Sequence, residues 1–368
     1  MNDPVVIALQ SSAPAVEGKK KHVKRTAKDI SQRTRLIVQS LFIVLNVWLC
    51  AQFYLFVRYF EGAGVGPHVS RPAGVDGWLP IAGLMNTRYF VSTGRIPAIH
   101  PAAMILFLIF TVSSLLLKRA FCSWLCPVGT LSEYLWKIGQ RLLGRNLTLP
   151  RWLDIGLRGI KYLLLAFFVF IIGSMSAASL EDFMVQPYGI LADVKMLHFF
   201  EHIGGAALIT VIVLAALSVV IKNFWCRYAC PYGAWMSLAS AVSPWRIRRD
   251  EEACAACGKC SKACPQHLPV ADLIQVRSLE CTGCMTCVAS CASEGALQFS
   301  LPPRKASTVS ERWRGRVLSP VGVAVVIAVL FFGGVGAAKL SHHWQTNISD
   351  DAYRQLIPHV DDDTHPGF

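Results

Sequence analysis

Two cysteine-rich runs, CAACGKCSKACP at 254–265 and CTGCMTCVASCA at 281–292, determine how the rest of the chain is interpreted. In both runs the cysteines follow the spacing C-x2-C-x2-C-x3-C. A gap of two residues wraps the backbone around one corner of a metal–sulfur centre, so that its amides point at the sulfur atoms. Gly258 and Gly283 lie inside these turns, where a positive φ costs a glycine little. The runs therefore predict two metal–sulfur centres with thiolate ligands.

The spacing is typical of chains that hold two [4Fe–4S] clusters, each bound by three cysteines of one run and the fourth of the other. This crossed assignment gives cluster one Cys254, Cys257, Cys260 and Cys291, and gives cluster two Cys281, Cys284, Cys287 and Cys264. Zinc knuckles and disulfides are the alternatives. Zinc sites usually show two CxxC pairs, and disulfides need an oxidising compartment. We therefore expect a ferredoxin-like α+β domain with two [4Fe–4S] clusters over 251–300, closed by a short returning strand at 294–300.

The composition of the whole chain is that of a membrane protein. Of its 368 residues, 53% are hydrophobic, and the mean hydropathy is +0.43. Five segments carry no charge over about the 20 helical residues that cross a bilayer core. They are 36–57, 96–117, 162–180, 203–221 and 317–338. The sequence thus predicts an α-helical membrane protein with about five transmembrane helices and an inserted two-cluster domain.

The lysines and arginines, 36 in a chain of net charge +13, are distributed unevenly. Residues 1–35, 118–161 and 222–316 hold 8, 8 and 13 of them, which is 29 together. Because basic loops stay in the cytoplasm, we expect the N-terminus and the two-cluster domain there, and the C-terminus on the periplasmic side of a bacterial inner membrane. Anionic lipid accounts for the basic excess, so no nucleic-acid binding is expected. The first apolar run is too long for a cleaved signal peptide and is interpreted as an anchor.

The membrane part contains an internal repeat that ends in a cysteine motif. FCSWLCPVG at 121–129 follows the second apolar segment, and WCRYACPYG at 225–233 follows the fourth. Four residues recur at an offset of 104: Lys118 and Lys222, Cys122 and Cys226, Cys126 and Cys230, Gly129 and Gly233. Two copies of span–loop–span–CxxxCP, over 36–145 and 146–250, predict a pseudo-two-fold unit.

This pseudo-symmetry would bring the motif cysteines together in one site. A third [4Fe–4S] cluster is the first interpretation, with Cys122, Cys126, Cys226 and Cys230 as its ligands. Its charge would be offset by basic neighbours, which also keep thiols ionised; these are Lys118, Arg119, Lys222 and Arg227. The alternatives are structural thiols, a thiol–disulfide pair, or a single copper or zinc ion.

Shorter elements are expected between the spans. Pro127 suits the first position of a helix, and the amphipathic stretch 127–143 predicts a helix on the membrane surface. A second surface helix is expected over 231–250. The segment 77–94 is expected to form either a short interfacial or re-entrant helix on the outer side or a surface loop.

Three histidines, His100, His198 and His202, lie near the outer ends of the second and fourth spans. They are candidates for quinol contact, proton acceptance or haem ligation, and ordinary interfacial histidines are the alternative. His198 and His202 are four residues apart and could share one helix face. The same loops contain acidic residues that could also accept protons: Glu181, Asp182, Asp193 and Glu201.

Further divisions of the chain follow from composition. Residues 1–35 are expected to form a basic cytoplasmic arm, 301–316 a basic linker, 317–338 the fifth span and 339–368 an acidic outer tail. The tail is either solvated or a copper-binding segment. Its candidate copper ligands are His342, His343, His359, His365 and Asp361 to Asp363.

The paired CxxxCP motifs, each preceded by a lysine and followed by the two cysteine runs, resemble the polyferredoxin-type membrane 4Fe–4S proteins. This group includes the quinol dehydrogenase subunit of periplasmic nitrate reductase systems (NapH), the membrane half of the nitrous-oxide-reductase accessory protein NosR, and the FixG/CcoG proteins of cytochrome oxidase assembly. The resemblance covers roughly 36–300. It implies transfer of electrons between a quinol pool, or another donor, and a partner protein. The chain departs from the larger members, because no flavin-attachment domain is expected before the first span and no β-domain after the fifth.

Three functions are open from the sequence. The first is an inner-membrane electron-transfer protein, related to quinol dehydrogenase subunits, with quinone, two ferredoxin clusters and a CxxxCP-held centre. The second is a copper-reducing or metalloenzyme assembly factor, and the third is a membrane redox sensor. No nucleophile, oxyanion site or phosphate site is evident, so chemistry beyond redox is not expected.

Overall fold

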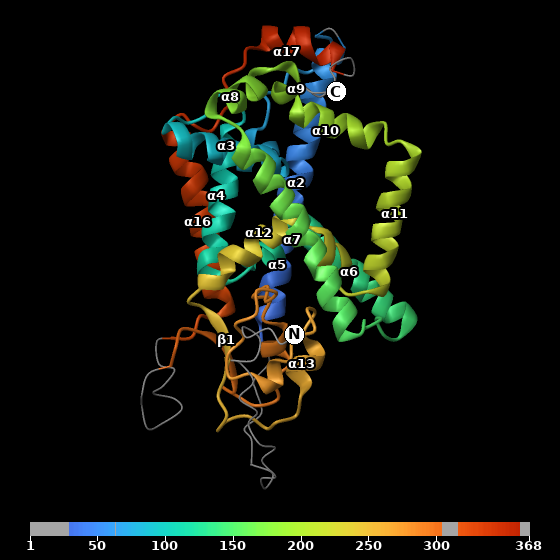
Figure 1. Cartoon of the computed structure of the whole chain (residues 1–368), viewed down its shortest axis with the longest axis vertical. Helices are drawn as coiled ribbons and strands as arrows, with labels where there is room; N and C mark the ends of the chain where they lie inside the picture. The colour runs from blue at the N-terminus through green and yellow to red at the C-terminus, as the bar shows by residue number, and fades with distance from the viewer. Residues whose placement is uncertain (1–28, 63, 304–315, 361–368) are drawn as a thin grey trace.

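The computed structural model describes residues 29–62, 64–303 and 316–360. Most of this part of the chain is helical, with the ferredoxin-like segment at one end and α17 at the other (Figure 1). We call these the ferredoxin end and the far end. The α-helices are α2 Ser31–Glu61, α3 Pro80–Thr93, α4 Pro101–Leu117, α5 Ala120–Trp124, α6 Pro127–Leu143, α7 Arg151–Ser174, α8 Ala177–Val185, α9 Pro187–Ile190, α10 Ala192–Glu201, α11 Gly205–Val220, α12 Pro231–Ala239, α13 Lys259–Ala263, α14 Thr286–Ala289, α16 Pro320–Leu340 and α17 Asp350–Leu356. The shorter turns are η1 Ala73–Trp78, η2 Trp225–Ala229, η3 Ser240–Val242, η4 Val270–Asp272 and η5 Ile357–His359, and the strands are β1 Arg246–Arg249 and β2 Leu297–Ser300.

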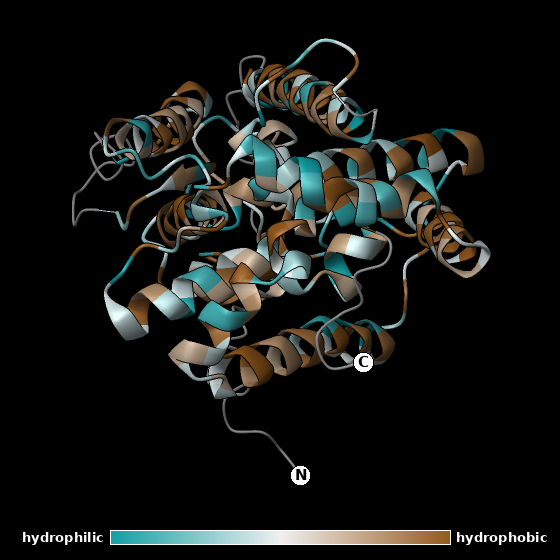
Figure 2. Cartoon of the chain, turned by 90° about the horizontal axis from the view of Figure 1, so that it is seen from above, coloured by the Kyte–Doolittle hydropathy of each residue, from teal (hydrophilic) through white to brown (hydrophobic). Residues whose placement is uncertain are grey.

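Among the described residues, three helices, α2, α7 and α16, are long and apolar enough to cross a membrane. Helices α10 and α11 form a pair bent by 83°, which gives a fourth span if the pair is counted as one, and α4 is a shorter apolar helix of 17 residues. Large hydrophobic side chains such as Trp48, Phe170 and Phe332 are exposed on these helices, and Figure 2 shows that hydrophobic residues make up much of the helical chain. Exposed apolar surface of this extent suits contact with lipid. The expectation of a helical membrane protein is therefore confirmed at the level of three to four spans.

The expected second surface helix over 231–250 is wrong beyond Ala239. Residues Arg246–Arg249 instead form β1, which pairs antiparallel with β2, with Arg246 opposite Ser300 and Arg249 opposite Leu297. Pro244 stands just before the strand, and proline disfavours helical backbone in the residue that precedes it. Strand β2 is the returning strand expected after Cys291. The two strands close the base of the inserted segment.

Two other expectations are settled by the structure. The segment 77–94 contains a helix, α3, which ends at Gly94 with a left-handed φ of 70°, so the surface-loop alternative is wrong. The tail is not simply solvated, because α17 packs onto α2, with the Tyr353 ring 5.1 Å from that of Phe56. Residues 1–28 of the basic arm, 304–315 of the linker, and His365 and Asp361 to Asp363 of the tail lie outside the described residues.

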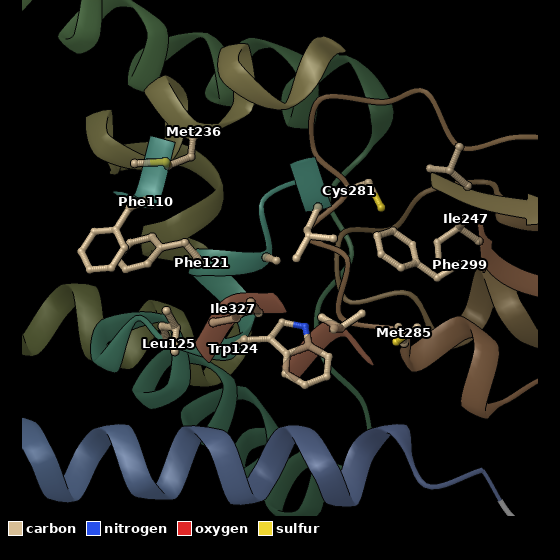
Figure 3. Close-up of a cluster of buried hydrophobic side chains, with 14 of the residues drawn as sticks. Phe110, Phe121, Trp124, Leu125, Met236, Ile247, Cys281, Met285, Phe299 and Ile327 are labelled. Carbon is tan, nitrogen blue, oxygen red and sulfur yellow. The ribbon is translucent and has the colours of Figure 1, made fainter. Parts of the chain in front are cut away.

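One hydrophobic core runs from the membrane helices into the ferredoxin end (Figure 3). Phe110, Phe121 and Trp124 of the first repeat belong to the same buried cluster as Ile247 and Phe299 of the two strands. Trp124 is fully buried, and its indole N–H donates to the Gly283 carbonyl over 3.3 Å. The inserted segment is thus docked on the membrane helices through a shared core, which fixes its distance from the CxxxCP motifs.

Candidate metal centres and adjoining cavity

The cysteines of the ferredoxin end lie in two groups. The thiol of Cys291 interacts electrostatically with those of Cys254, Cys257 and Cys260. Cys264, Cys281, Cys284 and Cys287 line one small cavity together. The structure therefore brings together the four cysteines that the crossed assignment gives to each cluster. Cys291 of the second run lies with the first group, and Cys264 of the first run lies with the second group.

The surroundings of these thiols suit bound iron. Burial raises the pKa of the Cys264 thiol to about 12, so a cation must replace its proton if it is to serve as a thiolate ligand at neutral pH. The turns have the expected geometry, because Gly258 and Gly283 have φ values of 68° and 62°. Four thiols and tight turns of free amides are the donor set of a [4Fe–4S] cluster.

The four CxxxCP cysteines also come together, from the two halves of the repeat. Cys126 and Cys230 cap the N-termini of α6 and α12, and their sulfur atoms accept from the Gly129 and Gly233 amides over 3.4 and 3.2 Å. Each cap is followed by proline at the first helical position, as expected. All four cysteines line one cavity, and the thiol of Cys226 interacts electrostatically with the other three. The two motifs thus form a single four-thiol site with matched amide donors.

The structure separates the four cations that were expected around this site. Arg119 lines the cavity beside Cys122 and interacts with it electrostatically. Lys118 and Lys222 instead interact with the ferredoxin cysteines Cys281 and Cys264. The backbone conformation of Lys118 explains why its side chain lies near the ferredoxin cysteines. A left-handed φ of 60° ends α4 at this residue, and its ammonium donates to the Arg277 carbonyl of the inserted segment.

Arg227, the fourth cation, pairs with a carboxylate of another helix. Its guanidinium forms an ion pair of 2.7 Å with Asp154 of α7. The expectation that all four cations serve the CxxxCP site is therefore corrected: Arg119 lies at that site, and the repeated lysines flank cluster two.

A buried ion network joins the CxxxCP site to the ferredoxin end. Arg119 donates to Glu280 over 2.9 Å, and Lys161 donates to both oxygens of the same carboxylate over 2.7 Å. Burial alone would raise the pKa of Glu280, but the neighbouring Arg119 and Lys161 lower it to about 2. Glu280 directly precedes Cys281, so Arg119 links the two groups of cysteines: it interacts electrostatically with Cys122 and forms an ion pair with Glu280.

The sequence reasoning missed Lys161 and Glu280. The available signals were weak: a charged residue just before a cluster cysteine, and a lysine just before an apolar span. Their pairing spans 119 positions of the chain, so nothing local in the sequence indicates it.

The cavity at the CxxxCP site has a volume of about 550 Å³ and extends towards the far end. Along α2 its lining runs from Phe42 to Gln52, which is about 15 Å of helix at 1.5 Å per residue. Leu49, Phe331 and Val335 are among the apolar side chains along its length. Arg71 lines its other end.

Behind Arg71 lies a buried group of charged residues, Arg71, Asp76, His100 and Asp193, which we call the Arg71 cluster. Arg71 bonds to Asp76 and donates to Asp193 over 2.8 Å. His100 Nδ1 lies 2.9 Å from Asp76 Oδ1, and its Nε2 lies 3.1 Å from the Gly189 carbonyl. Asp76, His100 and Asp193 are close enough to hold one metal ion, but the Arg71 guanidinium already bonds to both carboxylates.

The three candidate histidines therefore have different surroundings. His100 is buried in the Arg71 cluster, whereas His198 lies 2.8 Å from Glu61 and its ring stacks edge-on with that of His202. Neither His198 nor His202 lines the cavity. Arg71 and Asp76 were missed by the sequence reasoning, because the glycine- and proline-rich stretch that contains Arg71 and leads into η1, where Asp76 lies, resembles an ordinary connection.

Comparison with known proteins agrees with these sites. The family described as "4Fe-4S binding domain" matches residues 99–146 and 203–249, one CxxxCP motif in each, and "4Fe-4S dicluster domain" matches residues 246–292. YccM of Escherichia coli (strain K12), provisionally named an electron transport protein, is 49% identical over 324 residues, which are 88% of this chain and 89% of YccM. No solved structure matches the chain.

More distant relatives share the cysteine motifs over part of the chain. The ferredoxin-type protein NapH of Escherichia coli (strain K12) is 26% identical over 227 residues, which are 59% of this chain and 74% of NapH. The regulatory protein NosR of Stutzerimonas stutzeri is 28% identical over 187 residues, which are 49% of this chain and 24% of NosR. With the near full-length match to YccM and the matched iron–sulfur domains, the chain belongs to the polyferredoxin-type family of 4Fe–4S membrane proteins.

Proposed function

We propose that the protein passes electrons from the quinol pool to a redox partner through the CxxxCP-held centre and the two ferredoxin clusters. The observation that carries this proposal is the position of the CxxxCP thiols. They lie between an apolar cavity, which can hold a lipid-soluble donor, and a network that leads to Cys281 of cluster two.

The cysteine groups support three [4Fe–4S] clusters in this path. Cluster one would be held by Cys254, Cys257, Cys260 and Cys291, cluster two by Cys281, Cys284, Cys287 and Cys264, and the third by Cys122, Cys126, Cys226 and Cys230. When bound, such clusters supply one-electron carriers whose potentials depend on burial and neighbouring charge. The protein's own residues fix the order of the carriers.

The proposed setting is a bacterial inner membrane. We assign spans to α2, α4, α7, the α10–α11 pair and α16, with the ferredoxin end in the cytoplasm and the far end in the periplasm. The positive-inside rule supports this orientation, because 29 of the 36 basic residues fall in segments assigned to the cytoplasm. A redox partner would then meet cluster one, whose ligand Cys257 is exposed.

The test is iron and sulfide analysis with EPR on protein purified without oxygen. We compare the native protein with the double variant Cys122→Ser/Cys226→Ser, and use Cys50→Ser, a change at an exposed cysteine of α2, as the matched control. Three [4Fe–4S] clusters predict about 12 iron atoms per chain, falling to about 8 in the double variant only.

About 8 iron atoms in all three proteins would contradict a cluster at the CxxxCP site. The copper-reducing assembly factor would then become the better interpretation, and copper binding by the four thiols would be measured next. Anaerobic addition of quinol to the native protein tests the donor, since reduction of the clusters by quinol should produce their EPR signals.

A further inference from the structure

The two ends of the cavity differ chemically. One end presents four thiols and Arg119, and the other presents the buried Arg71 and the exposed Lys339, with apolar side chains between them. A ring-shaped redox carrier with oxygen atoms and an apolar tail matches this lining. Arg71 is a buried cation away from the thiols and has no part in ligating metal there, so it requires a different explanation.

The Arg71 cluster sets Arg71 and His100 against two carboxylates. The ring nitrogens of His100 lie next to Asp76 Oδ1 and the Gly189 carbonyl. The Arg71 Nη2 atom lies 3.0 Å from His100 Nδ1 and bonds to the same Asp76 oxygen. Arg71 and His100 therefore share one carboxylate, and Arg71 also bonds to Asp193. The hydroxyl of Tyr353, on α17, is the remaining titratable group that interacts with Arg71 and both carboxylates.

Three polar atoms of this region are buried without a hydrogen-bond partner among the described residues. They are Arg71 Nη1, Asp76 Oδ2 and the Tyr353 hydroxyl. A buried donor or acceptor left unpaired is unfavourable, so such atoms usually have a ligand or water as partner. Arg71, which lines the cavity, thus has an unused donor, and Asp76 next to it has an unused acceptor. A ligand with a hydroxyl group could form a hydrogen bond with each of them.

We propose that the Arg71 cluster binds the headgroup of the quinol and takes its protons. This inference rests on the proposed function, because it assumes that quinol is the donor. Arg71 Nη1 donates to one quinol oxygen, and Asp76 Oδ2 accepts a proton as the quinol O–H bonds break. Oxidation of one quinol gives one quinone, two protons and two electrons. The electrons reduce two [4Fe–4S] clusters by one each, and the protons leave by way of Asp76, His100 and Tyr353 at the far end.

Quinone binding is the first test and does not depend on turnover. Trp78 and Trp344 both line the cavity, so a bound short-chain naphthoquinone or benzoquinone should quench tryptophan fluorescence. In Arg71→Gln we expect the quinone affinity to fall by at least tenfold. Arg71→Lys keeps the charge that faces the carboxylates but lacks the planar fork of donors, so it should fold like the native protein and still bind quinone more weakly.

The matched control for Arg71 is Arg88→Gln. Arg88 belongs to α3 at the same end of the molecule, bonds to Ser92 and does not line the cavity. Its quinone affinity should equal that of the native protein. Native affinity in both Arg71 variants would overturn the headgroup contact.

Proton acceptance is tested by anaerobic stopped-flow reduction of the clusters with short-chain quinol across a pH series. Asp76→Asn should bind quinone but be reduced by quinol at least tenfold more slowly, with a flattened pH profile. Dithionite, which needs no proton acceptor, should reduce the variant at the native rate. The control is Asp351→Asn, an exposed carboxylate of α17. An unchanged quinol rate and pH profile in Asp76→Asn would overturn the proton role.

Failure of the inference and failure of the proposed function give different results. If quinol does not reduce the native clusters although dithionite does, the proposed donor is wrong, and the inference falls with it. If quinol reduces the native protein and all Arg71 and Asp76 variants alike, only the inference is wrong. Iron content and the thermal unfolding midpoint, measured for each variant, establish that it is folded and loaded.

Discussion

Arg119 is one side chain that lies between two groups of cysteines. Its guanidinium is completely buried, interacts electrostatically with Cys122 and donates to Glu280. Arginine suits this position because it stays charged when buried and presents several donors in one plane. A cation held between the two proposed clusters would stabilise added electrons on both of them.

Glu280→Gln should destabilise the junction between the membrane helices and the ferredoxin end. The change leaves Arg119 and Lys161 buried without their counter-ion, and breaking a buried ion pair in this way costs about 3–5 kcal/mol. We expect a lower midpoint of thermal unfolding and faster loss of iron on heating. Glu251→Gln is the control, because Glu251 forms an exposed pair with Arg249, and such pairs contribute at most about 1 kcal/mol. Equal effects of the two changes would contradict a structural role for the buried network.

The two glycines of the CxxxCP repeats should tolerate alanine differently. A Cβ atom at Gly129 would lie 2.2 Å from the Cys122 carbonyl oxygen, whereas one at Gly233 would lie 3.5 Å from that of Cys226. Gly129→Ala must therefore displace the first motif, and we expect a loss of about 4 iron atoms per chain. Gly233→Ala should keep the native iron content. Full iron content in both variants would show that the first motif is less tightly packed than the structure indicates.

Helix α17 is an element whose position was not expected. It begins at Asp350, capped by Ser349 with Asp350 and Asp351 in its first turn, as acidic residues favour a helix N-terminus. Tyr353, Ile357 and Val360 are buried in one cluster with Phe53, Phe56 and Phe60 of α2. The tail therefore covers the far end, next to the Arg71 cluster.

Tyr353→Ala should loosen this cover. Truncating a buried aromatic side chain to alanine typically costs about 3–5 kcal/mol, so we expect protease cleavage within the tail at a concentration that leaves the native protein intact. Arg354→Ala, on the exposed face of the same helix, should cleave like the native protein. Equal resistance of the Tyr353 variant would mean that α17 is held by other contacts.

Elements with a strong local signal could be predicted from the sequence, and those fixed by distant partners could not. Runs of uncharged apolar residues located α2, α7 and α16, and proline after each motif cysteine located the starts of α6 and α12. The sequence RIRR of strand β1 is typical of an exposed basic segment and does not by itself predict a strand. Its pairing with β2 depends on residues about 50 positions away. The same limit applied to the site, where cysteine spacing indicated the metal ligands, but Arg71 and Asp193 meet across 122 positions.

At the scale of the whole molecule, the two ends have separate tasks. The ferredoxin end carries the grouped cysteines of residues 254–291, and the far end carries the Arg71 cluster under α17. Helices α2, α4, α7 and α16 run between them (Figure 1). The proposed orientation would therefore place electron delivery and proton release on opposite sides of the membrane.

Reporter fusions test this orientation. Alkaline phosphatase needs disulfides, which form in the periplasm and not in the cytoplasm, so a fusion after residue 349 should be active and one after residue 250 inactive. A fluorescent protein that matures only in the cytoplasm should give the reverse pattern at the same two positions. The opposite result for both reporters would invert the topology and move the ferredoxin clusters outside.

The pairing of β1 with β2 has a consequence for how such chains diversify. The inserted segment leaves the membrane part at Arg249 and returns at Leu297, and these residues are directly opposite each other in the two-stranded sheet. An insertion whose two ends are adjacent can be lengthened, shortened or exchanged without moving the helices that carry it. The paired strands β1 and β2 would therefore allow a different electron-carrying domain to be inserted into the same membrane unit. Such a domain would have to supply a carboxylate that pairs with Arg119 and Lys161, as Glu280 does here.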